Sequence, residues 1–439
     1  MKRISILGLI LCTCLVSAAM ALSASAQGNG ALPAGQNSFA GVRIINSERT
    51  VLHDDIVHYR YTVVVGPGPF DRIGLHRVVK ESHPYWPAKT VDGVLLVGGS
   101  PNSFDMIFLE PSISSVPAWD HSIAVFLAKN GIDVWGTDYR WALVPAGTTD
   151  FNFMKGWGLE KDIQDTKIAL SLARLLRGST GQGFGQLHLL GFSYGVDVAY
   201  GVANQESQEP NLLRNVKGII PVDYGINYPD GSPIQTASCD GVAANQALLD
   251  AGVYNDTSGV FFEQVGDLAR SAPNDQSPFM DGVTNYEFAL FAGASAQPPP
   301  EGWHFVGGYF NDSGITTDLR YTDPWLWIDV LRAVPPYLPV RVDLDDNAAE
   351  GCNGVVAPFD DHLGDIAVPI LYVGAGGGTG KYGYYTTTLT ASKDITKFTV
   401  QLQPDDQRAV DFGHADLFMA RDAETLVWKP ILDWLVAHR

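Results

Sequence analysis

A serine between two glycines is the first feature of this sequence that could do chemistry. The stretch 191–195 reads Gly-Phe-Ser-Tyr-Gly and follows the apolar run 187–190. A serine hydroxyl is a weak nucleophile until a base removes its proton, and a sharp turn between a strand and a helix can present it to that base. A Cβ at Gly191 or Gly195 would crowd the backbone of such a turn. We therefore expect Ser193 to be a nucleophile; the alternative is an ordinary turn in which Ser193 caps the helix.

The segments around this serine alternate between strand-like and helix-like patterns. Continuous apolar strands that alternate with helices predict an α/β protein with a mostly parallel sheet covered by helices on both faces. Pro430 lies inside the last helical pattern and should kink or restart that helix. The expected strands are 58–65, 74–80, 91–97, 132–136, 186–190, 216–222, 366–373 and 397–402, and the expected helices are 119–130, 159–176, 196–204 and 423–438.

The alternation stops at 226–365, a stretch rich in Gly, Pro, Asp and Trp. We therefore expect the fold in two parts, 39–225 and 366–439, with 226–365 as a cap insertion over the carboxyl edge of the sheet, where ligands bind in open α/β folds. Its aromatic residues would favour an apolar, water-poor pocket. They are Trp303, Phe305, Tyr309, Phe310, Tyr321, Trp325, Trp327 and Tyr337.

The N-terminus has the pattern of an export signal. Lys2 and Arg3 precede an apolar run at 4–22, and Ala24-Ser25-Ala26 forms a cleavage site. We expect residues 1–26 to be a signal peptide cleaved after Ala26, residues 27–38 to be a flexible leader, and the mature protein to be secreted or periplasmic. A retained anchor is the alternative.

The cysteine and charge content fit an exported protein without a nucleic-acid partner. Cleavage would leave Cys239 and Cys352, which in an oxidising compartment most simply form one disulfide; two separate thiols are the alternative. The net charge is −19 at pH 7 and becomes more negative without residues 1–26, which disfavours nucleic acid and anionic lipid. No further apolar run reaches spanning length, so we expect no stable membrane insertion. The oligomeric state is left open.

Several segments together resemble the α/β-hydrolase fold. LHLLGFSYG (187–195) is similar to its nucleophile elbow, VLLVGGSPNSF (94–104) to its oxyanion-hole loop, and FLAKNGIDVWGTDYR (126–140) to the helix and strand that follow. PILYVGAGGG (369–378) is similar to the late strand that usually delivers the acid, and GHADLF (413–418) to the catalytic-histidine loop. The resemblance implies a serine hydrolase.

The family order of serine, acid, histidine implies a base late in the chain. His414 lies in a Gly-containing loop between the last expected strand and the last helix, whereas His362 lies where the insertion ends. We expect His414 to be the base. The resemblance also implies an oxyanion hole formed by the N–H of Tyr194 and the N–H of Ser100, after Gly98-Gly99.

The acid departs from the family pattern. The usual position falls near Gly378, and no carboxylate follows before Asp394. Asp411 and Asp416 are too close to His414 in sequence to reach it easily. Asp223 directly follows the strand 216–222, and some lipases of this fold carry their acid there, so we expect Asp223 to be the acid. Asp360 and Asp361 are the alternatives.

Two other acidic motifs receive structural interpretations. Asp138 and Arg140 should form an ion pair with each other. Asp343, Asp345 and Asn347 have the alternate spacing of a calcium loop, but Ala348 replaces its turn glycine, so a solvated acidic loop is expected. No cysteine–histidine cluster suggests zinc, and we expect neither a metal nor a cofactor.

These expectations combine into one hypothesis. The chain is an exported serine hydrolase that cleaves small-molecule or lipid-like carboxylic esters, with apolar acyl or aryl groups, through an acyl-enzyme. A serine nucleophile speaks against epoxide hydrolysis and dehalogenation. A peptidase or acyltransferase with the same triad, and a non-catalytic binding protein with this fold, remain the alternatives.

Overall fold

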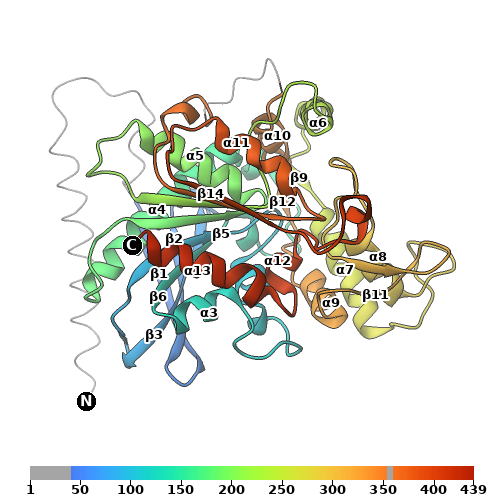
Figure 1. Ribbon diagram of the computed structural model, residues 1–439, viewed down its shortest axis with the longest axis horizontal. Helices are drawn as coiled ribbons and strands as arrows, with labels where there is room; N and C mark the ends of the chain where they lie inside the picture. Colours follow the sequence, from blue (N-terminus) through green and yellow to red (C-terminus); the bar gives the residue numbers. More distant parts are fainter. Residues whose placement is uncertain (1–40, 353–358) are drawn as a thin grey trace.

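The computed structural model of the protein describes residues 41–352 and 359–439 and is built around one twisted sheet (Figure 1). In this part of the chain ten strands join in the order β1-β2-β3-β6-β5-β7-β8-β13-β14, with β4 paired to β3. Their bounds are β1 (Arg43–His53), β2 (Ile56–Val64), β3 (Arg72–His83), β4 (Trp86–Pro87), β5 (Asp92–Val97), β6 (Ile132–Asp138), β7 (Leu187–Phe192), β8 (Val216–Val222), β13 (Ile370–Ala375) and β14 (Ile395–Val400).

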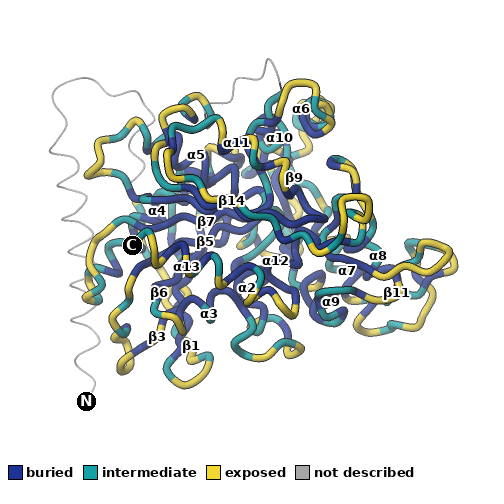
Figure 2. The backbone as a smooth tube through the Cα atoms, in the orientation of Figure 1, coloured by how far each residue is buried: buried dark blue, intermediate teal, exposed yellow. Residues whose placement is uncertain are grey.

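The sheet is parallel from β6 to β14 and antiparallel at its β1 end. Strands β5, β7 and β13 are buried along their whole length (Figure 2), as expected for continuous apolar runs covered on both faces. The expectation of a mostly parallel sheet is confirmed. The edge strand β1 was not expected, because its sequence RIINSERTVLH is largely polar and its side chains are mostly exposed.

Helices cover both faces of the sheet. On one face α4 (Leu159–Ser179) and α5 (Gly195–Ser207) pack in one apolar cluster, and on the other α3 (Ile123–Lys129) and α13 (Lys429–Ala437) pack in a second. A π-helical turn, Glu424–Trp428, precedes α13, and Pro430 lies in the first turn of α13. The expected restart at Pro430 is confirmed, since proline is tolerated in a first turn, where its missing N–H leaves no bond unmade. Shorter helices are α2 (Phe104–Phe108), α11 (Tyr384–Thr388) and α12 (Asp416–Met419).

Between β8 and its neighbour β13 the chain leaves the sheet and forms a set of further helices (Figure 1). Helices α6 (Pro233–Asp250) and α10 (Val340–Ala349) pack together, as do α7 (Ser258–Ser271), α8 (Asn285–Ala294) and α9 (Pro324–Arg332). Two short antiparallel pairs accompany them: β9 (Asn255–Asp256) with β12 (Leu338–Pro339), and β10 (Gly308–Phe310) with β11 (Thr316–Leu319).

A disulfide closes this excursion. Cys239 on α6 is bonded to Cys352, just after α10, over a sequence separation of 113 residues. The expected pairing is therefore present. The bridge holds the first helix of the excursion next to its last one.

Two structural expectations were wrong. The stretch around Asp343 and Asp345 is not a solvated loop but helix α10, and Asp345 is buried, where it accepts hydrogen bonds from Leu159 N (3.0 Å) and Arg341 Nε (2.7 Å). Burial raises the pKa of Asp343 to about 8. The pattern was misread because the apolar partners of α10 lie far away in sequence.

Asp138 and Arg140 do not pair with each other. Arg140 donates to Asp165 and Asp71, and Asp138 accepts from His76 and from Phe104 N (2.8 Å). Residues two apart in a strand share a face, but β6 ends at Asp138 and Arg140 has helical backbone angles (φ −54°, ψ −44°), so the strand geometry that would favour their pairing does not extend to Arg140.

The expected signal peptide (1–26) and the whole of the expected leader (27–38) lie outside the described residues. Within the described ranges, no helix combines the length and the apolar character that crossing a membrane would require.

Candidate active site

Ser193 lies on a tight turn between β7 and α5. Its φ of 56° is in the left-handed region, which is strained for a residue other than glycine. A Cβ built on Gly191 would lie 2.0 Å from the carbonyl oxygen of Gly195, and one on Gly195 would lie 2.3 Å from that of Val97. Both glycines are therefore needed for the backbone to pass, as the Gly-x-Ser-x-Gly spacing predicted.

The loop after β5 lies directly against this serine. A Cβ on Gly99 would be 2.6 Å from Ser193 Cβ and 3.0 Å from its Oγ. The buried hydroxyl of Tyr139 donates to Gly98 O (2.8 Å) and fixes the start of the loop. Ser100, which follows Gly99, belongs to this same loop. Tyr139 was not singled out from the sequence, because nothing near it in the chain indicates a partner.

Tyr194 holds the other side of the turn. Its buried hydroxyl donates to Asp162 Oδ2 on α4 (2.8 Å), and burial raises the pKa of Asp162 well above its ordinary range. The side chain of Tyr194 is thus fixed against α4. Its backbone N–H lies at the first turn of α5, where amide groups point outward and can bind negative charge.

Asp223 and His414 are in direct contact. Asp223 follows β8, the strand next to β7, and its Oδ2 lies 2.7 Å from Nδ1 of His414. Asp223 is fully buried and His414 is buried as well. A carboxylate can only accept, so Nδ1 carries the proton and Nε2 is left with a lone pair, the form that a general base needs. Within the described residues no hydrogen bond joins Ser193 Oγ to His414, a contact that often tightens only when substrate binds.

The loop after β13 forms a cradle for the Asp223 carboxylate. Its Oδ1 accepts from Ala375 N (2.8 Å) and Gly380 N (2.7 Å), and its Oδ2 accepts from Thr379 N (3.1 Å). A Cβ on Gly378 would lie 1.8 Å from Oδ2. The carboxylate of Asp223 therefore occupies the space into which a side chain at 378, the usual acid position of the fold, would extend.

The segment 302–307 of the excursion packs on the loop of His414. His304 O accepts from His414 N (3.0 Å), and Phe305 O accepts from Ala415 N (2.7 Å). His304 N donates to Gly377 O in the cradle loop (3.0 Å), and its buried ring contacts Asp411 O through Nε2 (2.9 Å). The position of His304 indicates a structural role, which no local sequence signal could have shown.

Only part of the expected aromatic lining meets the site. The rings of Trp303 and Phe305 lie 5.2 and 6.3 Å from the His414 ring, and Phe192 stacks on it at 4.5 Å. Tyr309 and Phe310 are instead exposed on the β10–β11 hairpin. The surroundings of His414 are therefore apolar, but through few of the residues that composition suggested.

The other carboxylates considered as the acid have different partners. Asp360 accepts from Asn227 (2.9 Å) and Asp361 from Asn204 (2.9 Å). Asp411 accepts from the N–H groups of Leu402, Gln403 and Phe412, and Asp416 from those of Gly307 and Gly413 and from the Thr322 hydroxyl. His362 lies near Asp361 and Asp365 at the surface.

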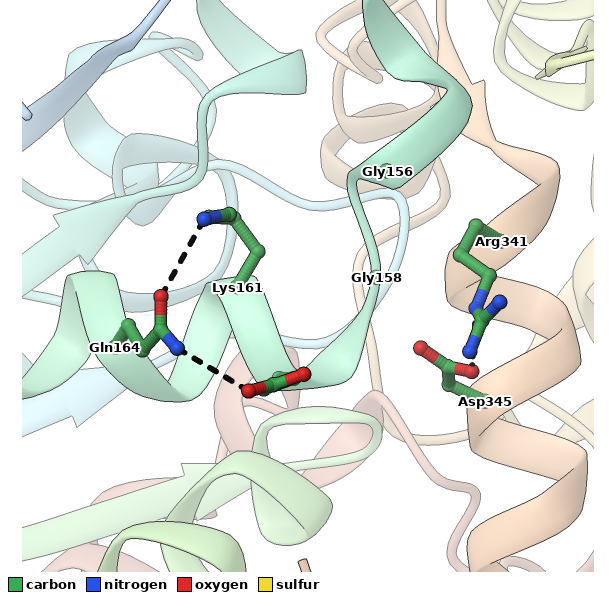
Figure 3. Close-up of a pocket in the computed structure, with 7 residues that line it drawn as sticks. Gly156, Gly158, Lys161, Gln164, Arg341 and Asp345 are labelled. Carbon is green, nitrogen blue, oxygen red and sulfur yellow. Dashed lines mark hydrogen bonds and ion pairs between the residues drawn. The ribbon is translucent and has the colours of Figure 1, made fainter. Parts of the chain in front are cut away.

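A polar cavity of about 300 Å³ lies elsewhere, between the start of α4 and helix α10 (Figure 3). Its charged lining includes Lys161, Glu160, Arg341 and Asp345, and contains neither Ser193 nor His414. We therefore locate the candidate site by the geometry of Ser193, Asp223 and His414 and not by this hollow.

Comparison with known proteins gives the fold. Neither a family model nor a curated sequence matches the chain. Among solved structures, a candidate lipase from Sulfolobus solfataricus aligns over 90% of this chain and 100% of its own, with 19% identity and a TM-score of 0.59. A soluble variant of monoglyceride lipase from Saccharomyces cerevisiae aligns over 93% and 99%, with 11% identity and a TM-score of 0.44. Together with the sheet order, the first match shows that the chain has the α/β-hydrolase fold, as the sequence motifs implied.

Proposed function

We propose that the protein is a serine hydrolase that cleaves carboxylic esters through an acyl-enzyme, with Ser193 as nucleophile, His414 as base and Asp223 as acid. The observation that carries the proposal is the buried 2.7 Å contact between His414 and Asp223, next to a serine held at φ 56° by flanking glycines. One structure that shares this fold was solved as a candidate lipase, which is consistent with the same chemistry.

Each group has a defined step in this proposal. Nε2 of His414 takes the proton from Ser193 as Oγ attacks the ester carbonyl carbon, and the backbone N–H groups of Tyr194 and Ser100 bind the oxyanion. The same proton then passes to the departing alcohol as the C–O bond breaks and the acyl-enzyme forms. Water, deprotonated by His414, then attacks the acyl carbon, and His414 returns this proton to Ser193 Oγ as the bond between the acyl carbon and Oγ breaks and the acid is released. Asp223 holds the tautomer of His414 and stabilises its charged form.

The substrate class follows from the surroundings of His414. Trp303, Phe305 and Phe192 place three aromatic rings around the imidazole, and an apolar, water-poor site favours apolar acyl or aryl esters over sugars or charged metabolites. We also propose that the protein acts after export, on small or lipid-like esters.

A fluorophosphonate probe tests the nucleophile. We expect stoichiometric labelling, mapped by mass spectrometry to Ser193 and lost in Ser193→Ala. Ser103→Ala is the matched control, because Ser103 is also partly buried, lies near the same loop and makes no capping hydrogen bond. Absence of labelling in the wild-type protein would refute the enzyme proposal and favour a binding protein.

A substrate panel tests the reaction. We expect turnover of p-nitrophenyl esters, with a preference that varies with acyl chain length and aromaticity. Labelling of Ser193 without ester turnover, together with turnover of amides or transfer to an acceptor alcohol, would instead identify a peptidase or an acyltransferase.

A further inference from the structure

A second group of titratable side chains lies between β2, β3 and α2, outside the proposed catalytic site. His58 on β2 and His76 on β3 are buried, and Asp105 on α2 is half-buried. One ligand atom from each, two imidazole nitrogens and a carboxylate oxygen, lie within 4.8 Å of one another. The three residues are 18 and 29 positions apart in sequence, so no metal-binding motif announces them.

Strand register brings the two histidines together. Arg60 is directly opposite His76 in the β2–β3 ladder, so His58, two residues earlier, is its diagonal neighbour on the same face. His58 Nε2 and His76 Nδ1 are 2.9 Å apart. On the other side of β3, Asp138 reaches His76 Nε2 at 2.8 Å.

These contacts fix which nitrogen of His76 faces the group. Asp138 can only accept a hydrogen bond, so His76 carries its proton on Nε2 and presents the lone pair of Nδ1. A carboxylate behind a histidine is the usual outer partner of an imidazole that binds a metal ion. In the 2.9 Å contact His58 Nε2 donates to this lone pair, and His58 presents a lone pair of its own at Nε2 once its proton is on Nδ1 instead.

The carboxylate of Asp105 supplies the second, independent observation. Its Oδ2 is paired with Arg60, but its buried Oδ1 has no hydrogen-bond partner among the described residues and lies 3.9 Å from His76 Nδ1. A buried carboxylate oxygen without a partner is costly. Here it faces two imidazole nitrogens that can both present lone pairs.

We propose that His58, His76 and Asp105 bind a divalent transition-metal ion, with Zn²⁺ as the best fit. Two imidazole nitrogens and one carboxylate oxygen suit Zn²⁺ better than Ca²⁺ or Mg²⁺, and three protein ligands leave a fourth position for water. Ligand atoms of a tetrahedral zinc site are about 3.3 Å apart at bond lengths near 2.0–2.1 Å. The separations of 2.9 Å (His58 Nε2 to His76 Nδ1) and 3.9 Å (His76 Nδ1 to Asp105 Oδ1) bracket that value, and all three ligand atoms lie within 4.8 Å of one another.

The ion would join β2, β3 and α2, and α2 directly follows the proposed oxyanion loop. Asp138 also accepts from Phe104 N, the first residue of α2, and the Phe104 ring stacks on His76 at 4.5 Å between centroids. A Cβ on Gly136 would lie 2.1 Å from that ring, so glycine makes the room for it. A metal ion on Asp105 and the two histidines would therefore stabilise α2 against the sheet.

Titration of the chelator-treated full-length protein with Co²⁺ and Zn²⁺ tests the site. We expect one equivalent of Co²⁺ to give the intense visible absorption of a four-coordinate ion, Zn²⁺ to displace it at micromolar or lower concentration, and Zn²⁺ to raise Tm. His58→Gln and Asp105→Asn should each weaken binding at least 100-fold. His83→Gln, an exposed histidine outside the group, should bind like the wild type.

X-ray absorption of the wild-type protein with one equivalent of Zn²⁺ needs no variant and covers the case in which a substitution prevents folding. We expect scattering from two imidazoles and an oxygen ligand. No binding at 100 μM Zn²⁺, a spectrum with fewer than two imidazoles, or unchanged affinity in folded His58→Gln and Asp105→Asn would overturn the proposal and leave the group as a hydrogen-bonded network only.

Discussion

Replacement of Gly378 by alanine should abolish the proposed ester hydrolysis by displacing the proposed catalytic acid. The new Cβ would lie 1.8 Å from Asp223 Oδ2, whereas ordinary van der Waals contact begins near 3.4 Å, so the carboxylate has to move by more than an ångström. That oxygen is the one that holds His414 Nδ1 at 2.7 Å. A shift of this size removes the hydrogen bond that orients the base.

The expected loss approaches that of removing the acid, about 10³–10⁴ in kcat. The cost in stability should be smaller, because the clashing atoms belong to the end of a side chain and not to the backbone. Ester turnover and thermal unfolding, measured side by side, separate the two effects. Gly185→Ala is the matched control, since nothing lies within 4 Å of a Cβ at that exposed position. Near-wild-type kcat in a folded Gly378→Ala protein would refute the assignment of Asp223.

The same geometry allows the acid to be moved. Gly378 has no left-handed φ, so it can accept aspartate, and Asp223, at φ 55°, can become glycine without strain. Asp223→Gly alone should lose about 10⁴ in kcat, and Gly378→Asp alone should also be poorly active because two carboxylates compete for one space. The double variant should recover at least tenfold over Asp223→Gly; no recovery in a folded double variant would show that position 378 cannot reach His414.

Three further changes test other parts of the structure. Ser193→Gly should abolish turnover by up to about 10⁶ in kcat, as Ser193→Ala should. The glycine variant should also be more stable to denaturant than the alanine variant by about 1 kcal/mol, because glycine relieves the strain at φ 56°. Equal stability of the two variants would contradict the strain argument. Replacing Cys239 and Cys352 by serine should cost on the order of 4 kcal/mol in unfolding free energy, measured in urea without reductant, and an unchanged midpoint would show that the bridge does not form. Burial and the neighbouring Asp346 raise the pKa of Glu350 to about 8 from an ordinary 4.5. Between these two pH values the folded chain keeps a proton that the unfolded chain releases. The stabilisation that is fully present below pH 4.5 is therefore lost as pH rises through 8. Glu350→Gln should flatten this dependence by on the order of 1–4 kcal/mol between pH 5 and 9 in urea titrations; an unchanged pH profile would show that Glu350 does not hold that proton.

Sequence reasoning located the proposed triad because chain order and strand ends carry the information. Ser193 and Asp223 each directly follow an apolar strand, and the parallel register of β7 and β8 then places both at the same sheet edge. The absence of a carboxylate near Gly378 was itself informative, because it required an acid from another strand. The structure explains how an acid at 223 can serve in place of one at 378, because the Asp223 carboxylate lies in the space that a side chain at 378 would occupy.

The features that could not be predicted from the sequence depend on contacts between segments that are far apart in the chain. Helix α10 was misread because its buried acidic groups are stabilised by partners such as Leu159 N, which is 186 positions away from Asp345. The pairing of Arg140 with Asp165 and Asp71 was also not predicted, because these partners are 25 and 69 positions away in sequence. His58 and His76 are ordinary strand residues until the β2–β3 register is known.

The hydrogen bonds between the segment 302–307 and the loops of His414 and Gly377 limit how this part of the chain can be exchanged. An insertion that covers a pocket but makes no hydrogen bond to the catalytic loops can be replaced by a shorter or longer one without disturbing those loops. Here the backbone of His304 and Phe305 completes the scaffold of the proposed base, so removing 226–365 would leave His414 N and Ala415 N without their acceptors. A chimera with a foreign insertion should therefore need this six-residue strip to be kept, and selectivity would be re-engineered around Trp303 within it and not by swapping the whole insertion.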